Sequence, residues 1–312
     1  MMLKQMLMCG AALVSVAMAA PVEWLADLET AGKKAAAEKK LVLVEFTGSD
    51  WCGACKLQQK NVLDKPEFAK WVNKHCVPAV VDVPQDANRV GGGAKKRYNE
   101  MLCEVYDIKS FPSLKMMSPE LIVLGGYGGA QRTPQAAIAT LEKSFAAAKK
   151  LENAKKMQGE ARTQALLALY EATPAKDTES RFHLLQLIVD ADPEDKAGML
   201  TTYRNCKQLR QVEIDRQLAS SSEERLVLVE KALAEAEPGN VGALRKLMGD
   251  TMREVAVKLT VSPKSVQDVE KARDLILESI SYMDGEKERA TLRQFVELNY
   301  ANPAAIYEKR KK

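Results

Sequence analysis

The chain has 312 residues, of which 46% are hydrophobic and 28% charged, with a formal net charge of +4. This composition is that of an ordinary globular protein, and the length suits two domains better than one hydrophobic core. So small a net charge gives no reason to expect a nucleic-acid partner, and the basic stretch 308–312 is interpreted as a solvated tail.

Residues 1–20 have the pattern of a cleaved secretory signal. A lysine lies near the start, an apolar stretch runs from Met6 to Met18, and small residues precede Pro21. This pattern predicts cleavage after Ala19 or Ala20 and export of the mature chain to a bacterial periplasm or beyond. The alternative is an uncleaved anchor, but the apolar stretch is shorter than the roughly 20 residues that span a bilayer.

The central stretch of the sequence is an apolar run followed by two cysteines. The run from Leu41 to Phe46 is rich in β-branched residues and bounded by Gly, Ser and Asp, so it predicts a buried strand. After Trp51-Cys52-Gly53-Ala54-Cys55-Lys56, apolar residues at helical spacing predict a helix as far as Trp71. The two cysteines are therefore expected where a strand turns into a helix.

That position carries chemistry for the two thiols. A helix N-terminus presents free N–H groups and partial positive charge, which stabilise a thiolate. We therefore expect Cys52 to be the more acidic thiol and the nucleophile, with Cys55 as its partner. At this spacing a disulfide needs a tightened first turn, which predicts a strained and reducible bond. Gly53 and Ala54 are small enough to permit that turn and the approach of a partner's backbone.

The remaining cysteines give a weaker pattern. Cys9 lies in the expected signal and would be lost with it, whereas Cys76, Cys103 and Cys206 remain in an oxidising compartment. A structural disulfide between Cys76 and Cys103 is one interpretation. The alternative is that all three are small buried residues. The cysteines lack zinc-ligand spacing and the two histidines are distant from the central pair, so we expect no metal and no other cofactor.

The rest of the first 150 residues alternates between helical and strand patterns, with a glycine-rich loop at 91–93 and a Gly-rich exit after the last strand. Ser118-Pro119-Glu120 predicts the turn of an antiparallel hairpin, and Thr133-Pro134 predicts a helix N-cap followed by proline at the first helical position. The predicted helices cover residues 22–40, 95–106 and 134–145, and the predicted strands residues 77–83, 114–117 and 121–124.

This order of elements resembles the thioredoxin family. The motifs that carry the resemblance are Trp-Cys-Gly-Xaa-Cys-Lys after a buried strand and Tyr-Asp-Ile-Lys-Ser-Phe-Pro before the hairpin, about sixty residues later. Similar variants include exported bacterial thioredoxin-like proteins with Phe-Thr-Gly-Ser-Asp-Trp-Cys and the thiol-donating end domain of the bacterial membrane disulfide reductant. The resemblance covers about Val22 to Lys149 and implies an α/β thioredoxin fold, a central mixed sheet flanked by helices, with thiol–disulfide exchange at Cys52 and Cys55.

The resemblance also implies roles for four other residues. Pro112 would be cis, lie against the sulfurs and expose backbone that binds an extended substrate peptide, with Phe111 beside it. Glu45 matches a buried acid that assists proton transfer to the second cysteine; the alternative is a surface glutamate on an edge strand. The cation that partners this acid in thioredoxin has no counterpart in residues 78–83. Trp51 would shield the sulfurs, and its alternative role is core packing.

Beyond Lys150 the composition changes to Ala, Leu, Lys and Glu with almost no strand signal. Turn signals such as Thr173-Pro174 and Pro238-Gly239 divide this region into amphipathic pieces. We therefore expect a signal at 1–20, a thioredoxin-like domain at 21–150 and an α-helical domain at 151–312. The last would hold about six or seven helices in antiparallel pairs, without the tetratricopeptide pattern.

The leading hypothesis is an exported thiol–disulfide oxidoreductase that reduces or isomerises disulfides through Cys52 and Cys55. Its partners would be disulfide-containing protein substrates and a membrane or soluble thiol donor or acceptor. The alternative is a binding or scaffold protein, in which residues 151–312 hold a protein partner or a second copy and the thioredoxin-like part docks. A third hypothesis is Cu(I) handling by the two cysteines. Gly53-Ala54 does not set the redox direction.

Overall fold

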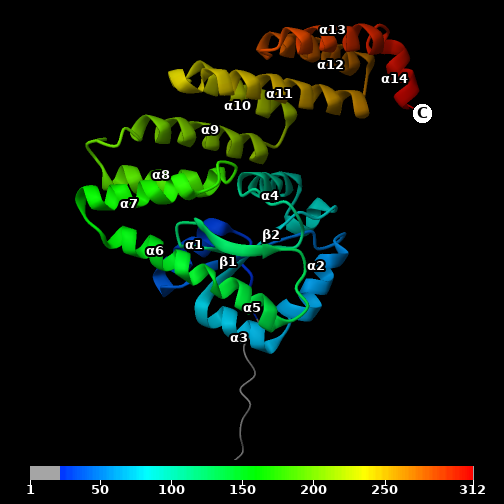
Figure 1. Cartoon of the computed structure of the whole chain (residues 1–312). Coiled ribbons are helices and arrows are strands. Elements are labelled where there is room, and N and C mark those ends of the chain that lie inside the picture. Colours follow the sequence, from blue (N-terminus) through cyan, green and yellow to red (C-terminus); the bar gives the residue numbers. More distant parts are fainter. Residues whose placement is uncertain (1–21, 312) are drawn as a thin grey trace, which may run out of the picture.

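The computed structural model describes residues 22–311, and the expected signal at 1–20 lies outside them. Figure 1 shows a sheet with helices on its two faces, followed by a stack of helices that extends away from it to the C-terminus. The expected α/β part and the helical part after it are both confirmed. Among the residues described, no helix has the length and apolar character needed to cross a membrane.

The sheet is mixed, as expected, and has four strands in the order β2-β1-β3-β4. β2 is parallel to β1, and β3 is antiparallel to both β1 and β4. β1 therefore lies inside the sheet and pairs on both of its edges, which agrees with its nearly continuous apolar run. The strands are β1 (Leu41–Thr47), β2 (Cys76–Asp82), β3 (Ser113–Met117) and β4 (Val123–Gly128).

Helices cover both faces of this sheet. α1 (Leu28–Glu38) and α4 (Gly93–Val105) pack on one face, and α3 (Pro66–His75) and α5 (Pro134–Glu142) on the other. Val44 and Phe46 of β1 enter the first core, whereas Leu43 enters the second. Because side chains alternate along a strand, Glu45 points to the same side as Leu43.

The first helix starts later than predicted. α1 begins at Leu28 because the Asp27 carboxylate accepts a backbone N–H at 2.7 Å and caps the helix. The residues before it are extended, and Leu25 exchanges two backbone hydrogen bonds with β2, of 3.0 and 2.8 Å. The start predicted at residue 22 was wrong because the spacing of Trp24 and Leu25 also fits a helical period.

The helix predicted after the cysteines is divided into three pieces. These are α2 (Gly53–Gln58), the π-helical turn η1 (Gln59–Leu63) and α3. Pro66 occupies the first position of α3 because proline lacks the N–H that an interior helical position must donate. Farther along, Thr133 caps α5 as predicted, with its hydroxyl accepting the Ala136 N–H at 3.3 Å.

The hairpin is present, but its second strand is displaced from the predicted 121–124. Leu121 has a φ of 64° and belongs to the turn, where its N–H donates to the Ser118 carbonyl at 2.9 Å. β4 instead contains the glycines that were expected to follow the strand. A Cβ on Gly126 would collide with the Leu114 carbonyl oxygen of β3, so strand pairing itself requires glycine there.

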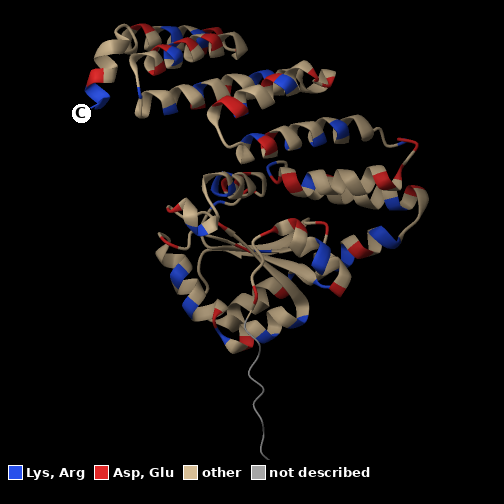
Figure 2. Cartoon of the chain, turned by 180° about the vertical axis from the view of Figure 1, so that it is seen from behind, with Lys and Arg blue, Asp and Glu red and all other residues tan. Residues whose placement is uncertain are grey.

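The helical region continues from the sheet through α6 (Ser144–Lys156). The six or seven helices predicted after Lys150 were too few, because eight α-helices follow α6 in the described residues. Figure 1 shows them stacked in successive layers, and Figure 2 shows acidic and basic residues interspersed along them. They are α7 (Gly159–Ala172), α8 (Thr178–Ala191), α9 (Leu200–Leu218), α10 (Ser222–Ala234), α11 (Val241–Val261), α12 (Val266–Ser279), α13 (Glu286–Asn299) and α14 (Pro303–Lys311).

Polar contacts join the helical region to the sheet. Ser180 of α8 accepts the Val123 N–H at the edge of β4, at 2.9 Å. Arg97 of α4 donates to two backbone carbonyls at the C-terminal end of α9, at 3.1 and 2.7 Å. Next to this junction, Arg210 of α9 donates from two nitrogens to the buried Glu179 of α8, at 2.6 to 3.0 Å.

Candidate active site

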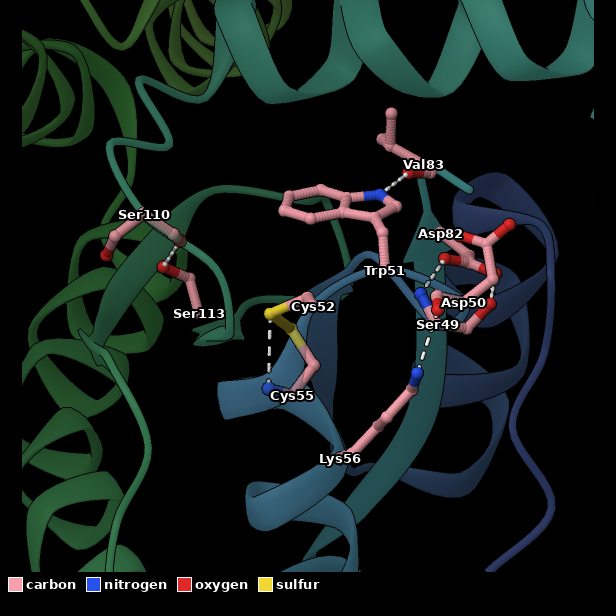
Figure 3. The surroundings of a disulfide bond; sticks show 10 residues. All are labelled: Ser49, Asp50, Trp51, Cys52, Cys55, Lys56, Asp82, Val83, Ser110 and Ser113. Atoms are coloured by element: carbon pink, nitrogen blue, oxygen red, sulfur yellow. Dashed lines mark hydrogen bonds between the residues drawn. A yellow bond between two sulfur atoms is a disulfide. The ribbon is translucent and has the colours of Figure 1, made fainter. Parts of the chain in front are cut away.

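Cys52 and Cys55 form a disulfide at the start of α2, with their Cα atoms 5.2 Å apart (Figure 3). Cys52 is the N-cap residue, and its Sγ accepts the Cys55 N–H at 3.1 Å. The predicted position at a strand-to-helix transition is therefore confirmed. Since this N–H belongs to the first helical turn and donates to the sulfur, negative charge on the sulfur would be stabilised. Cys52 is 6% exposed and Cys55 3%.

The turn before the cysteines is fixed by two carboxylates. The Ser49 N–H and hydroxyl donate to the Asp82 carboxylate at 2.9 and 2.6 Å. The Asp50 carboxylate accepts the N–H groups of Gln85 and Asp86 at 2.9 and 3.0 Å. These bonds hold the turn that precedes Cys52 against the C-terminal end of β2 and the residues that follow it. No role was predicted for these residues, although Ser and Asp directly before Trp-Cys were a visible signal.

Trp51 lies at the surface of the site. Its side chain is 44% exposed, so the core-packing alternative was wrong. The indole Nε1 donates to the Val83 carbonyl at 2.8 Å, and Figure 3 shows the ring lying over the Cys52 side of the disulfide. The same ring makes an edge-to-face contact with Phe111, with centroids 5.7 Å apart. Its expected role in shielding the sulfurs remains a prediction.

The loop that carries Pro112 lies beside the disulfide. The Phe111–Pro112 peptide is cis, as the resemblance implied. The Pro112 carbonyl accepts the Gly129 N–H at 2.7 Å, and the Ser113 hydroxyl donates to the Ser110 carbonyl at 2.7 Å. Phe111 of this loop contacts the Trp51 ring. Figure 3 shows Ser110 and Ser113, at either end of the loop, on the side of the disulfide away from Asp82. The structure thus gathers the predicted cysteines, tryptophan and proline, and substrate binding by this loop remains a prediction.

Glu45 is buried beneath the site. It is 5% exposed on β1, which lies between β2 and β3, so the edge-strand alternative was wrong. Burial raises the pKa of its carboxyl to about 7; a hydrogen bond with Thr47 opposes this rise, and the charges of Asp82 and Asp64 add to it. A carboxyl with this pKa both binds and releases a proton near neutral pH.

A cavity of about 600 Å³ connects Glu45 with the second cysteine, because both residues line it. The cation expected from thioredoxin is absent from 78–83, but basic side chains from α2, η1, η2 (Ala87–Val90) and α4 line the same cavity. Its volume is sufficient for several water molecules. The charged residues that line it besides Glu45 are Asp64, Asp82, Lys56, Lys60, Arg89 and Lys95.

The other cysteines do not form the disulfide that was considered. Cys76 and Cys103 are unpaired thiols, so that interpretation was wrong. Cys76 is buried, with its Sγ 3.7 Å from the Met116 sulfur, and Cys103 and Cys206 are partly buried. Burial raises the pKa of Cys76 and Cys103 to about 12, which keeps both protonated at neutral pH. In the part of the chain that the structure describes, no group of three or more His, Cys, Asp or Glu side chains could hold a metal ion.

Comparison with known proteins identifies the part of the chain that contains this site. Residues 23–119 match a family described as thioredoxin-like. This segment is a thioredoxin-like domain. The thioredoxin-like domain contains the disulfide, Trp51, Glu45 and Pro112, and its two cysteines fit the Cys-X-X-Cys pattern.

Two curated relatives come from Chlamydia pneumoniae. The chain is 31% identical to the disulfide bond reductase DsbH over 83 residues. This match covers 27% of this chain and 49% of the relative. The chain is 33% identical over 107 residues to the thioredoxin-related protein DsbJ, covering 29% of this chain and 31% of the relative. The matches thus span about half and a third of these proteins. A solved structure named DsbH Oxidoreductase has 25% identity and a TM-score of 0.38, covering 44% of this chain and 94% of that one.

Proposed function

We propose that this protein is an exported thiol–disulfide oxidoreductase that reduces or isomerises disulfides of other exported proteins. One observation carries the proposal: a Cys52–Cys55 disulfide at a helix N-terminus, with the Cys55 N–H directed at the Cys52 sulfur. The similarity of the thioredoxin-like domain to a protein named disulfide bond reductase supports the reducing direction. The signal pattern at 1–20 supports export, with a mature chain that begins at Ala20 or Pro21.

The first chemical step uses the reduced protein. The Cys52 thiolate attacks one sulfur of a substrate disulfide, the substrate S–S bond breaks, and a mixed disulfide forms. The second substrate sulfur leaves as a thiolate and takes a proton from solvent. Backbone of the Phe111–Pro112 loop would hold the substrate peptide in an extended form next to Cys52. The Trp51 and Phe111 rings would supply its apolar contact.

The second step returns the protein to the state seen in this structure. Cys55 loses its proton and attacks the Cys52 sulfur, so the mixed disulfide breaks and the substrate leaves as a thiolate. We assign the proton to Glu45, either directly or through water in the cavity that both residues line. Two electrons have then passed from the protein to the substrate. An external thiol donor restores the dithiol for another cycle.

Trapping of the intermediate tests this proposal. In Cys55→Ala the second step is blocked, so mixed disulfides through Cys52 should accumulate on exported proteins and disappear on reduction. The matched control is the double variant Cys52→Ala, Cys55→Ala, which should trap nothing. Non-reducing electrophoresis followed by mass spectrometry measures both. If the single variant traps no more than the double variant, the chain is not an oxidoreductase of this kind.

The second candidate function is protein binding by the helical region, with the thioredoxin-like domain as a docking module. Phe295 and Leu298 of α13 favour it, since they are 47% and 74% exposed. This function predicts that Cys55→Ala traps no protein.

We also propose that the chain divides into a thioredoxin-like domain at residues 21–150 and an α-helical domain at 151–312. Helix α6 is continuous across this boundary.

A further inference from the structure

We propose that Gln58 is a positioning residue that fixes the helix carrying the dithiol against the segment that supports Pro112. It thereby sets how a protein disulfide docks beside Cys52. This inference rests on the proposed function, because it assigns a residue to that same site. Gln58 follows Cys55 by three residues, which places both on one side of α2.

Both ends of the Gln58 side chain are hydrogen-bonded inside the protein. The residue is fully buried, its Nε2 donates to the Tyr127 hydroxyl at 2.7 Å, and its Oε1 accepts the Gln131 N–H at 2.7 Å. A backbone N–H only donates, so Oε1 must face Gln131 and the amide nitrogen must face Tyr127. The side chain therefore spans from α2 to both ends of the segment 127–131.

The same segment supports the Pro112 loop on its other side. Gly129, midway between the two partners of Gln58, donates its N–H to the Pro112 carbonyl at 2.7 Å. Tyr127 pairs with Leu114 in the β3–β4 ladder, and Leu114 follows Pro112 by two residues. Hydrogen bonds thus lead from α2 through segment 127–131 to the loop whose backbone is expected to bind substrate.

The physical reason for this assignment is the cost of an unpaired buried amide. A buried polar group that loses its partner costs about 1–3 kcal/mol. Movement of α2 relative to segment 127–131 would break one or both bonds, so Gln58 restrains that movement. α2 has six residues and ends in a π-helical turn, so it has little rigidity of its own. Such movement would misalign a peptide bound to the Pro112 loop relative to Cys52, whereas a small disulfide that does not use the loop would be unaffected.

The test uses Gln58→Met, which keeps a similar length and removes both hydrogen bonds, and Tyr127→Phe, which removes one. Gln135→Met is the matched control, because Gln135 is an exposed glutamine on α5, a helix that packs on the same sheet. Two substrates are compared: insulin, whose disulfide is presented on a peptide, and 5,5′-dithiobis(2-nitrobenzoate), a small disulfide without a peptide backbone. KM and kcat are measured for insulin, and the second-order rate constant for the small disulfide.

For Gln58→Met we expect the KM for insulin to rise about tenfold, as for a loss of about 1.4 kcal/mol in binding. The rate with the small disulfide should stay within about twofold, and Tyr127→Phe should show a smaller rise in KM. Native-state hydrogen exchange of the Gly129 amide should accelerate in Gln58→Met and not in Gln135→Met. An unchanged insulin KM, unchanged Gly129 exchange, or an equal loss with both substrates would overturn the proposal.

Failure of the proposed function has a different signature. Wild-type protein would then reduce neither substrate, whereas the Gly129 exchange measurement would still decide whether Gln58 restrains the Pro112 loop. If exchange accelerates in Gln58→Met while wild type is inactive, the restraint exists and the oxidoreductase assignment falls. If exchange is unchanged, the positioning role falls whatever the activity.

Discussion

Glu45 in the thioredoxin-like domain and Glu179 in the helical region are equally buried, at 5% and 4% exposure, yet their pKa values shift in opposite directions. Burial raises the pKa of Glu45 to about 7, and two neighbouring carboxylates add to the rise. Burial also acts to raise the pKa of Glu179, but the His183 imidazole 3.4 Å away and the hydrogen-bonded Arg210 guanidinium lower it to about 2.

The difference shows what each region does with a buried charge. Glu179 is a fixed anion that holds α8 to α9 through the Arg210 guanidinium. Glu45 lines a cavity beside Cys55 and changes its protonation state near neutral pH. Environment thus makes one glutamate a structural charge and the other a candidate acid–base group.

The largest expected effect comes from breaking the ion pair between Glu179 and Arg210. Arg210→Met leaves Glu179 buried without its cation, and loss of one partner of a buried pair costs about 3–5 kcal/mol. Denaturant unfolding at pH 7 measures this change in the free energy of unfolding. Arg204→Met, an exposed arginine on the same helix, is the control and should change it by less than about 0.5 kcal/mol.

A second variant tests whether the loss comes from the unpaired charge. Adding Glu179→Gln to Arg210→Met removes that charge and should restore part of the stability at pH 7. The pKa of Glu179 is lower in the folded than in the unfolded state, so its stabilising effect is present above about pH 4.5. It is lost as the pH falls towards 2, and the penalty of Arg210→Met should shrink over the same range. A penalty independent of pH would point to lost packing of the arginine stem instead.

Glu45 should give the free energy of unfolding a pH dependence opposite to that from Glu179. The folded pKa of Glu45 lies above its unfolded value of 4.5, so the folded protein holds a proton that the unfolded chain releases. The free energy of unfolding therefore falls as the pH rises from about 4.5 to about 7. Glu45→Gln removes this loss and should stabilise the oxidised protein at pH 8 by up to about 3 kcal/mol, with little effect at pH 4.

Denaturant titrations at the two pH values measure this difference, with the exposed Glu67→Gln as control. Keeping the protein oxidised excludes titration of Cys52 and Cys55. Equal effects of Glu45→Gln at pH 4 and pH 8 would show that Glu45 does not titrate between them. Glu45 would then be ruled out as the proton acceptor for Cys55.

The smallest expected effect concerns the indole hydrogen bond beside the disulfide. Trp51→Phe keeps an aromatic ring against Phe111 and removes the bond to the Val83 carbonyl, worth about 1 kcal/mol. If the ring shields the sulfurs, alkylation of reduced Cys52 by iodoacetamide should speed up by at most about fivefold, which is the factor equivalent to that energy. Replacement of the aromatic ring, as in Trp51→Ala, should exceed this, and equal rates in all three proteins would remove the shielding role.

Local sequence signals predicted most of the framework around the site. An apolar β-branched run followed by Trp-Cys-Gly-Ala-Cys placed the cysteines at a strand-to-helix transition, and Thr133-Pro134 located the cap of α5. The cis peptide before Pro112 followed from the resemblance to a family. Boundaries were less accurate where two signals overlap, as for Trp24 and Leu25 before α1 or the glycines inside β4.

The sequence by itself therefore determined the order of the elements and the position of the cysteine pair at a helix N-terminus, because both depend on residues within a few positions of each other. The burial of Glu45 depends on β1 lying between β2 and β3, and the role of Gln58 depends on partners 69 and 73 residues away. Only the tertiary structure decided these features. Periodicity reports which side of an element is apolar, whereas strand order and long-range packing decide what that side meets.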